Sequence, residues 1–213
     1  AFLSYQYLLE AVLKKKHEIL ALFTQTAVEV CEGQQLDMDF ENRTDVAEAE
    51  YLEMIKLKTA VLLACSLKAG ALAAEADDET ARMLYVFGLN LGLAFQLQDD
   101  LLDSFGDQAV FGKKIGGDIN ANKKTFLLIK ALEKADETTK NDLMNWLKTT
   151  TPEDKKVNAI LGIYNRLNIK EITQAKIDEY FKYCSGILNT LKIEAEIKEN
   201  LRTISNIMLN RVF

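Results

Sequence analysis

Apolar residues recur at three- and four-residue steps along most of this 213-residue chain, which is the period of an α-helix. The polar run over 37–45 interrupts that pattern and is predicted to be a connecting loop. In chain order, helices are predicted from the first residues to about Gly33, over 47–74, from about Asp78 to Asp103 or beyond, and over 124–134, 137–149, 153–166, 170–192 and 195–211. The expected fold class is all-α.

Composition agrees with this pattern. The chain contains a single Pro, and Leu, Ala, Lys and Glu fill long uninterrupted stretches, which favours helices. Hydrophobic residues make up 48% and charged residues 27%, and the length is sufficient for one substantial core, so we expect a single helical domain over 1–213. Residues 106–122 hold four of the ten glycines and are predicted to form a long loop.

Charge and cysteine content exclude several classes of protein. The net charge is −6 and the lysines are scattered or confined to one loop, so no basic stripe is available to follow a nucleic-acid backbone. The three cysteines lack the spacing of a zinc site or a disulfide framework, which predicts buried thiols in a reducing compartment. No apolar run approaches the length of a membrane span and no signal-peptide pattern is seen, so we expect a cytoplasmic protein.

One acidic stripe interrupts the otherwise apolar third helix. At about 100° per residue, Gln96, Asp99, Asp100 and Asp103 fall within an arc of roughly 100°, and apolar residues occupy the other sides. A solvated helix face is one interpretation. It is weakened because like charges four residues apart repel, and acids near a helix C-terminus oppose its dipole, each costing about 0.3–1 kcal/mol. A bound cation would reverse both penalties.

The residue types indicate which cation this is. Carboxylates are hard oxygen ligands, and no His or Cys accompanies them, which favours Mg²⁺, with Mn²⁺ as an alternative, over zinc. Magnesium usually keeps several waters and binds substrate phosphates. The stripe therefore predicts a metal that joins Asp99, Asp100 and Asp103 to a phosphorylated ligand.

The predicted loop after the stripe supplies groups that bind phosphate. Lys113, Lys114, Lys123 and Lys124 lie among glycines, which let backbone amides approach an anion, while lysine adds positive charge. A solvated loop would be the preferred interpretation if these lysines stood alone. Their place directly after the acids favours a diphosphate held through metal on one side and through ammonium groups on the other.

Four segments resemble motifs of the polyprenyl synthetase family, in the same order. Residues 95–103 (FQLQDDLLD) are similar to the family's second aspartate-rich motif, and the glycines and lysines over 112–125 are similar to its lysine loop. Upstream, residues 33–37 (GQQLD) resemble a Gly-Gln-x-Leu-Asp segment, and Lys58-Thr59 resembles a Lys-Thr pair. Four motifs in order are hard to obtain by chance, and the resemblance covers essentially the whole chain.

The resemblance implies that the protein is a trans-prenyltransferase with the fold of this family. The fold is a bundle of long antiparallel helices around a deep cavity, where an allylic diphosphate ionises and isopentenyl diphosphate attacks it. Negative charge then develops on the leaving diphosphate, where metal and lysine stabilise it, and positive charge develops on the hydrocarbon, which an apolar, water-free cavity tolerates. A homodimer is implied by the family alone.

The resemblance also implies roles for individual residues. Lys58 would neutralise phosphate oxygens, and Thr59 and Gln96 would lie beside the allylic cation, so these three are the implied catalytic residues. The implied metal ligands are Asp99, Asp100 and Asp103, and the implied substrate-binding residues are Gln34, Asp37, Lys113, Lys114 and Lys123. Tyr51 and Phe95 are interpreted as core residues in preference to cavity liners.

One departure from the family is large. The family carries two aspartate-rich motifs, and this chain shows only the second; residues 77–81 (DDETA) lack an acid at the required step and are better explained as a helix cap. The helical pattern also opens at the first residues without a cap. We therefore expect a fragment or processed form of a longer synthase, lacking about the first third and poorly active by itself.

Two other functions compete with this hypothesis. A terpene cyclase shares the helical architecture and binds a diphosphate through metals. Cyclases usually carry a hydroxyl residue at the position of Asp103 and an acid four positions later, which Asp107 could mimic, but Asp103 and the lysine loop favour a synthase. A noncatalytic helical subunit that stabilises an active partner would explain the missing motif. The intact acidic stripe and lysine loop favour the synthase.

Two further residues remain. His17 receives no role, and Arg211 is a weak candidate for diphosphate binding.

Overall fold

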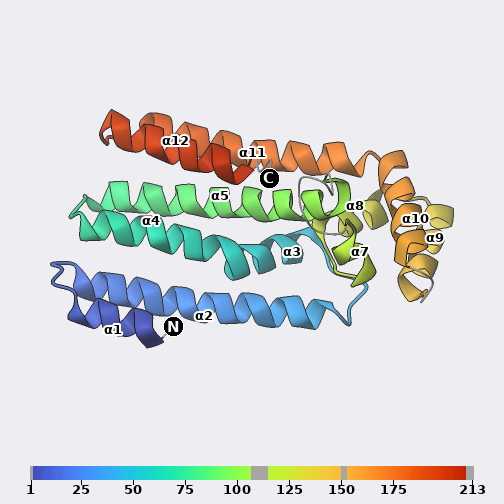
Figure 1. Ribbon diagram of the computed structural model, residues 1–213, viewed down its shortest axis with the longest axis horizontal. Helices are drawn as coiled ribbons and strands as arrows, with labels where there is room; N and C mark the ends of the chain where they lie inside the picture. The colour runs from blue at the N-terminus through green and yellow to red at the C-terminus, as the bar shows by residue number, and fades with distance from the viewer. Residues whose placement is uncertain (1, 107–114, 150–152, 210–213) are drawn as a thin grey trace.

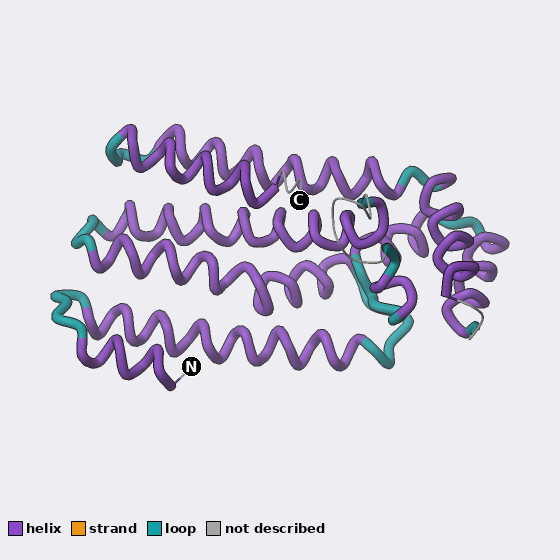
Figure 2. The backbone as a smooth tube through the Cα atoms, viewed as in Figure 1, coloured by secondary structure: helices purple, strands orange, loops and turns teal. Residues whose placement is uncertain are grey.

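The computed structural model describes residues 2–106, 115–149 and 153–209, and every regular element within these ranges is helical, which confirms the predicted fold class (Figures 1 and 2). In chain order the helices are α1 (Phe2–Glu10), α2 (Lys16–Phe40), α3 (Glu48–Ile55), the π-helix η1 (Lys56–Ala60), α4 (Val61–Ala73), α5 (Asp78–Phe105), α7 (Gly117–Asn120), α8 (Phe126–Lys134), α9 (Glu137–Lys148), α10 (Glu153–Arg166), α11 (Ile169–Thr190) and α12 (Ala195–Leu209).

The long helices run side by side along the long axis of the molecule. Helix α5 lies between α4 and α11, and α2 packs along η1 and α4 (Figure 1). The shorter helices α7, α8, α9 and α10 gather at one end. Helix α5 therefore contacts both the long-helix layer and the short-helix cluster, and its C-terminal half reaches the place where they meet.

Helix α5 begins where the sequence predicts. The carboxylate of Asp77 accepts a hydrogen bond from the Thr80 backbone N–H at 2.7 Å, so Asp77 is the N-cap of this helix. The same device opens α9, where Asp136 accepts from the Thr139 backbone N–H at 2.7 Å. These caps satisfy N–H groups that have no partner within the helix.

Small residues bring the central helices into backbone contact. A Cβ atom added at Gly92 of α5 would lie 2.5 Å from Cα of Ala60, and one added at Gly88 would lie 2.6 Å from Cα of Ala64. Gly88 and Gly92 are four residues apart and lie on one face of the helix. The small residues Ala60 and Ala64 therefore let α5 approach closely.

Three predicted boundaries are wrong. The first helix breaks between Glu10 and Lys16, and α2 then continues to Phe40, past the predicted end at Gly33. Phe40 is 3% exposed and belongs to the core, so tertiary packing extends the helix through residues whose polarity suggested a loop. The third difference is α7, a short helix inside the predicted loop 106–122.

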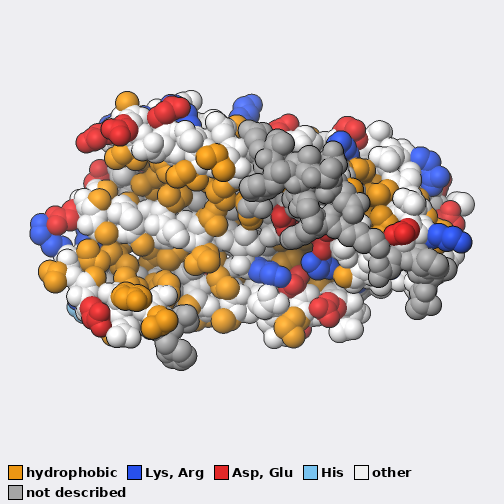
Figure 3. Space-filling model, in the orientation of Figure 1, with side chains coloured by type: hydrophobic (Ala, Val, Ile, Leu, Met, Phe, Trp, Pro, Cys, Tyr) orange, Lys and Arg blue, Asp and Glu red, His pale blue; other side chains and the backbone are white. Residues whose placement is uncertain are grey.

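Buried apolar side chains form two clusters. One surrounds α8, α10 and the adjoining parts of α5 and α11, and the other lies around the N-terminal part of α5, α4 and the C-terminal part of α11. Hydrophobic side chains also gather on the exposed surface over the long helices (Figure 3).

Within the described ranges, none of the helices combines the length and hydropathy that crossing a membrane requires. Cys65 and Cys184 are buried free thiols, as predicted, whereas the free thiol Cys31 is exposed, so the prediction of burial is wrong at that position.

Candidate functional site

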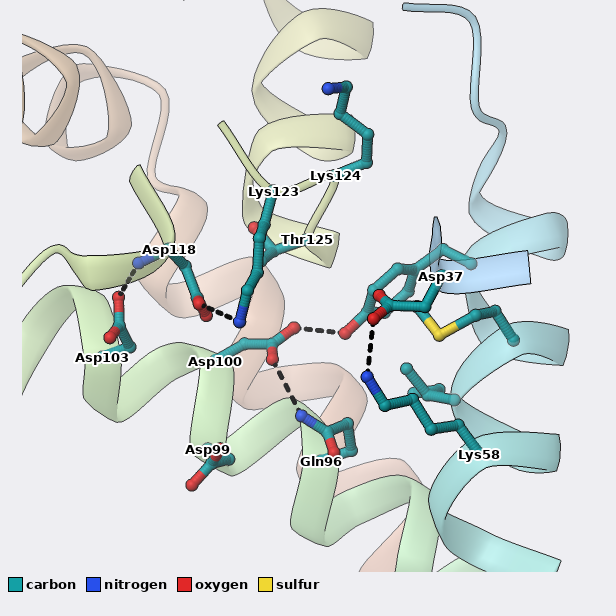
Figure 4. A pocket seen from close by; sticks show the side chains of 13 residues that line it. Asp37, Lys58, Gln96, Asp99, Asp100, Asp103, Asp118, Lys123, Lys124 and Thr125 are labelled. Carbon is teal, nitrogen blue, oxygen red and sulfur yellow. Dashed lines mark hydrogen bonds and ion pairs between the residues drawn. The ribbon is translucent and has the colours of Figure 1, made fainter. Parts of the chain in front are cut away.

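A polar pocket opens where α2, η1, α5 and the segment between α7 and α8 meet (Figure 4). Residues of α3 and α7 also contribute to it. Its lining residues are Asp37, Tyr51, Met54, Ile55, Lys58, Gln96, Asp99, Asp100, Asp103, Asp118, Lys123, Lys124 and Thr125. The structure thus brings together the acidic stripe and Lys123, which the sequence pattern had linked, with Asp37 and Lys58, which had been linked to them only through the family resemblance.

Asp100 is the most deeply buried acid of the stripe, at 5% exposure, which contradicts a solvated helix face at this position. Its carboxylate accepts hydrogen bonds from the Tyr51 hydroxyl and from Gln96 Nε2, the latter at 3.1 Å. Burial raises the pKa of Asp100 to about 7; these hydrogen bonds oppose the rise, and the charges of Asp118 and Asp99 add to it. Burial thus makes the ionised form of this carboxyl group costly, and a nearby cation would reduce that cost.

Tyr51 is both a core residue and part of the pocket. It is 2% exposed, and its ring packs in the hydrophobic cluster at this end of the molecule. Burial and the carboxylate of Asp100 raise the pKa of its hydroxyl well above the usual value, so the hydroxyl stays protonated and donates. The sequence interpretation of Tyr51 as core was correct but incomplete.

Thr59 and Gln96 extend this hydrogen-bond chain. Thr59 Oγ1 donates to Gln96 Oε1 at 3.0 Å, and Gln96 in turn donates to Asp100. The amide of Gln96 is therefore fixed in one orientation, with its oxygen toward η1 and its nitrogen toward α5. The two residues that the resemblance paired functionally are in direct contact.

Lys58 projects into the pocket from the π-helix η1 and pairs with Asp37 of α2, Nζ to Oδ2, at 2.6 Å (Figure 4). Helix α2 comes unusually close to η1 here, since a Cβ atom added at Gly33 would lie 2.3 Å from the Lys58 backbone nitrogen. A π-turn widens the helix and is frequent at functional sites. Gly33 therefore allows the contact that places Asp37 beside Lys58.

Asp103 connects α5 to the segment that follows it. Its Oδ2 atom accepts a hydrogen bond from the Asp118 backbone N–H at 2.9 Å, and its backbone carbonyl accepts one from Gly116 at 2.7 Å. Burial raises the pKa of the Asp103 carboxyl, while the Asp118 N–H lowers it. Gly116 has a φ of 82°, a left-handed conformation that glycine adopts without strain.

Lys123 reaches back across the pocket toward α5 and pairs with Asp118, Nζ to Oδ1, at 2.6 Å (Figure 4). Burial disfavours its charged form, but the ion pair with Asp118 and the charges of Asp37 and Asp100 together raise its pKa above the ordinary lysine value. Lys123 is therefore a stable cation that faces the acids of α5.

Lys124 has a different role from its neighbour. Its ammonium points away from the acids in Figure 4 and donates to the backbone carbonyls of Glu41, at 3.1 Å, and Asn122, at 2.9 Å. Burial lowers its pKa. These contacts tie the segment before α8 to the end of α2.

The remaining predicted residues are less informative. Gln34 is exposed on α2 and does not line the pocket. Lys113, Lys114 and Arg211 lie outside the described residues.

Asp118 is a site residue that the sequence analysis missed. It follows the Gly116-Gly117 pair within the segment that resembles the lysine loop, and only its contact with Asp103 shows that it belongs to the site.

The carboxylates fit a metal that is shared with a ligand better than a metal held by protein alone. Within the described ranges, no group of three or more acidic, His or Cys side chains converges on a single point. Mg²⁺ is usually bound by one or two carboxylates, with waters and substrate phosphates completing its octahedral shell. Asp99, Asp100 and Asp103 line one pocket and could each supply one such oxygen.

Comparisons with known proteins agree with this geometry. The sequence profile described as polyprenyl synthetase matches residues 1–164. A short chain isoprenyl diphosphate synthase of Methanothermobacter thermautotrophicus is 37% identical over 194 residues, 91% of this chain and 59% of that protein. A crystal structure of a geranylgeranyl pyrophosphate synthase superposes with a TM-score of 0.91 at 38% identity, covering 100% of this chain and 66% of that one.

A third comparison includes bound ligands. The geranylgeranyl pyrophosphate synthase of Corynebacterium glutamicum, solved with isoprenyl diphosphate and magnesium, gives a TM-score of 0.84 at 26% identity, covering 91% of this chain and 55% of that one. The chain thus spans less than two thirds of the length of each of these three relatives.

Proposed function

Because the chain belongs to the polyprenyl synthetase family, we propose that it acts in prenyl transfer, in which isopentenyl diphosphate is joined to an allylic diphosphate and a linear polyprenyl diphosphate is lengthened. The observation that carries this proposal is the pocket in which Asp99, Asp100 and Asp103 of α5 share one space with Lys58 and Lys123. The names of the relatives support the same reaction class.

In this proposal, Asp99, Asp100 and Asp103 hold Mg²⁺ against the allylic diphosphate. The presence of isoprenyl diphosphate and magnesium in the Corynebacterium glutamicum structure supports this choice, and manganese is an alternative of similar chemistry. The metal, when bound, neutralises part of the charge that builds on the leaving diphosphate. Its positive charge also favours the ionised form of Asp100, which burial alone disfavours.

The lysines bind the diphosphate from two sides. Lys58, from η1, and Lys123, from the segment before α8, provide ammonium groups that stabilise the developing negative charge. Asp37 keeps Lys58 extended into the pocket by pairing with it. The outer lysines Lys113 and Lys114, together with Gln34, are proposed substrate contacts on the family resemblance alone.

The hydrocarbon side of the reaction needs a different environment. Thr59 and Gln96 offer fixed oxygen dipoles beside the acids, which suit the positive charge that develops as the carbon–oxygen bond breaks. Met54 and Ile55 line the same pocket and limit the access of water to that cation. We include a homodimer and a cytoplasmic location in the proposal as expectations from the family and the composition.

Calorimetric titration with a nonhydrolysable allylic diphosphate analogue, with and without Mg²⁺, tests the proposal. We expect Mg²⁺-dependent binding that weakens by about tenfold or more in Asp100→Asn. Asp178→Asn is the matched control, because exposed Asp178 accepts a hydrogen bond from Gln174, four residues earlier, as Asp100 accepts one from Gln96. Equal binding by both variants would contradict the assigned site.

Product analysis separates the competing functions. Incubation with Mg²⁺, labelled isopentenyl diphosphate and an allylic diphosphate is expected to yield a longer linear diphosphate. A cyclic hydrocarbon would indicate a terpene cyclase. Binding without any product would favour the noncatalytic subunit, or the expectation that this chain is poorly active by itself.

A further inference from the structure

A buried lysine lies behind the pocket and outside its lining. Lys156 of α10 is 5% exposed, and its ammonium donates to Asn122 Oδ1 at 2.6 Å and to the Asn120 backbone carbonyl at 3.4 Å. Both acceptors are uncharged, and among the described residues no carboxylate pairs with it. Burial accordingly lowers the pKa of Lys156. Burying an ammonium group is costly, and among the described residues the contacts with Asn120 and Asn122 offset that cost.

Asn122, the partner of Lys156, is the residue immediately before Lys123. Its φ is 54°, a left-handed conformation that asparagine tolerates better than most residues. Its backbone N–H donates to Ile119 at 3.2 Å, and its carbonyl accepts from Lys124 at 2.9 Å. The chain therefore turns at Asn122, and the direction of that turn decides where Lys123 points.

The residue after Lys156 holds the other end of the same segment. Val157 is 7% exposed, and a Cβ atom added at Gly116 would lie 2.6 Å from its Cγ1 atom. Gly116 opens α7 and bonds to Asp103 of the acidic stripe. Two adjacent residues of α10 thus contact the beginning and the end of the segment that carries Asp118 and Lys123.

We propose that Lys156 is a positioning residue of the pocket: by fixing the side chain of Asn122, it aims Lys123 at the acids of α5. The proposal rests on the proposed function in so far as Lys123 binds a diphosphate. It assigns Lys156 no contact with substrate, and it predicts that the effect of Lys156 on binding passes through Lys123.

Lys156→Met removes the ammonium and keeps most of the buried apolar stem, and Lys155→Met, at the exposed neighbouring position, is the matched control. In titrations with Mg²⁺ and the diphosphate analogue, we expect Lys156→Met to raise the Kd about tenfold, a typical effect of losing a residue that orients a binding group. Lys155→Met is expected to leave it unchanged. A folded Lys156→Met variant with wild-type affinity would overturn the proposal.

A double-mutant cycle distinguishes positioning from a general loss of stability. In a Lys123→Met background, Lys156→Met is expected to weaken binding by less than about twofold, because the group that it aims is already absent. Independent, multiplicative losses would show that Lys156 does not act through Lys123. Thermal unfolding of each variant, followed in parallel, identifies any that do not fold.

Asn122→Gly provides a second variant in case Lys156→Met does not fold. Glycine keeps the positive φ but removes the oxygen that Lys156 contacts, so it should reproduce the loss of affinity. Amide hydrogen exchange provides a readout that needs no ligand: residues 117–124 should exchange faster in both variants while α4 and α5 are unaffected. If the wild type binds no diphosphate, the proposed function fails, and unchanged exchange would separately overturn the positioning role.

Discussion

On one side of the pocket, Lys58 and Gln96 project from helices that touch backbone to backbone; on the other, Asp118 and Lys123 project from a short segment held by hydrogen bonds. We call these the helix bank and the loop bank. Gly33 and Gly92 allow the contacts of the helix bank, where a single added methyl group would meet backbone atoms. The loop bank depends on Asp103 and Asn122 as hydrogen-bond acceptors.

The difference teaches how each bank responds to change. Where helices touch backbone to backbone, stability depends on side-chain volume, because the packing leaves no room for an extra methyl group. It depends much less on charge. A hydrogen-bonded segment responds to the removal of single donors and acceptors, since each leaves a buried partner unsatisfied. Substitutions and pH can therefore test the two banks separately.

The largest expected effect concerns Asp100, the buried carboxyl group of α5 on the helix bank. Its pKa of about 7 exceeds the ordinary value of 3.8, so between about pH 4 and 7 the folded protein keeps a proton that the unfolded chain has lost. The free energy of unfolding should therefore fall as pH rises through this window, by about 2–4 kcal/mol. Urea unfolding in metal-free buffer at several pH values measures this slope.

Asp100→Asn provides the comparison for that slope, since it removes the titrating group. The fall in stability between pH 4 and 7 should become clearly shallower in this variant, with Asp103 still contributing to it, and should keep its full slope in Asp178→Asn. Indistinguishable slopes in all three proteins would show that Asp100 does not titrate as its burial indicates.

The second effect tests the packing of the helix bank. Gly33→Ala places a methyl group 2.3 Å from the Lys58 nitrogen and 2.7 Å from the Leu57 carbonyl carbon, and backbone atoms cannot move away cheaply. We expect a loss of about 2–3 kcal/mol in the free energy of unfolding and weaker diphosphate binding through the displaced Lys58.

Gly70→Ala is the control for this substitution, because it lies in α4 and its added methyl group meets nothing within 4 Å. Helix propensity alone should stabilise this variant by about 0.5–1 kcal/mol. Chemical denaturation compares the two, and equal stability would mean that α2 and η1 are not in the close contact described.

The smallest effect belongs to the loop bank. Asp118→Asn removes the ion pair with Lys123, whose side chain is 57% exposed, so the free energy of unfolding should change by less than about 1 kcal/mol. Binding of the diphosphate analogue should change more than stability does, because Lys123 loses the partner that orients it. A loss of stability as large as that of Gly33→Ala would show that the banks do not differ as described.

Sequence reasoning predicted the helix bank better than the loop bank. The spacing of Asp99, Asp100 and Asp103 on one helix is a local pattern, which periodicity exposes. Asp37 was assigned to a loop yet lies in α2, because burial of Phe40 extends the helix and no local signal reports that burial. The π-helix η1, which carries Lys58 and packs against Gly33, was not predicted either.

The loop bank could not be assembled from sequence because its contacts join residues far apart in the chain. Asp103 and Asp118 are separated by 15 positions, and Asn122 and Lys156 by 34. Asparagine and lysine are ordinary surface residues in most contexts, and only burial shows that these two are partners.

The π-helix η1 also sets the rotational phase between two stretches of one continuous helix. A π-turn accommodates one more residue than an α-turn, so it rotates everything after it by about 100° relative to an uninterrupted α-helix. Before η1 the helix presents Tyr51 to the pocket; at the end of η1 and beyond, it presents Ala60 and Ala64 to the glycines of α5. An uninterrupted α-helix through the same residues would turn these two faces about 100° out of alignment, so the extra residue that η1 accommodates keeps both in place.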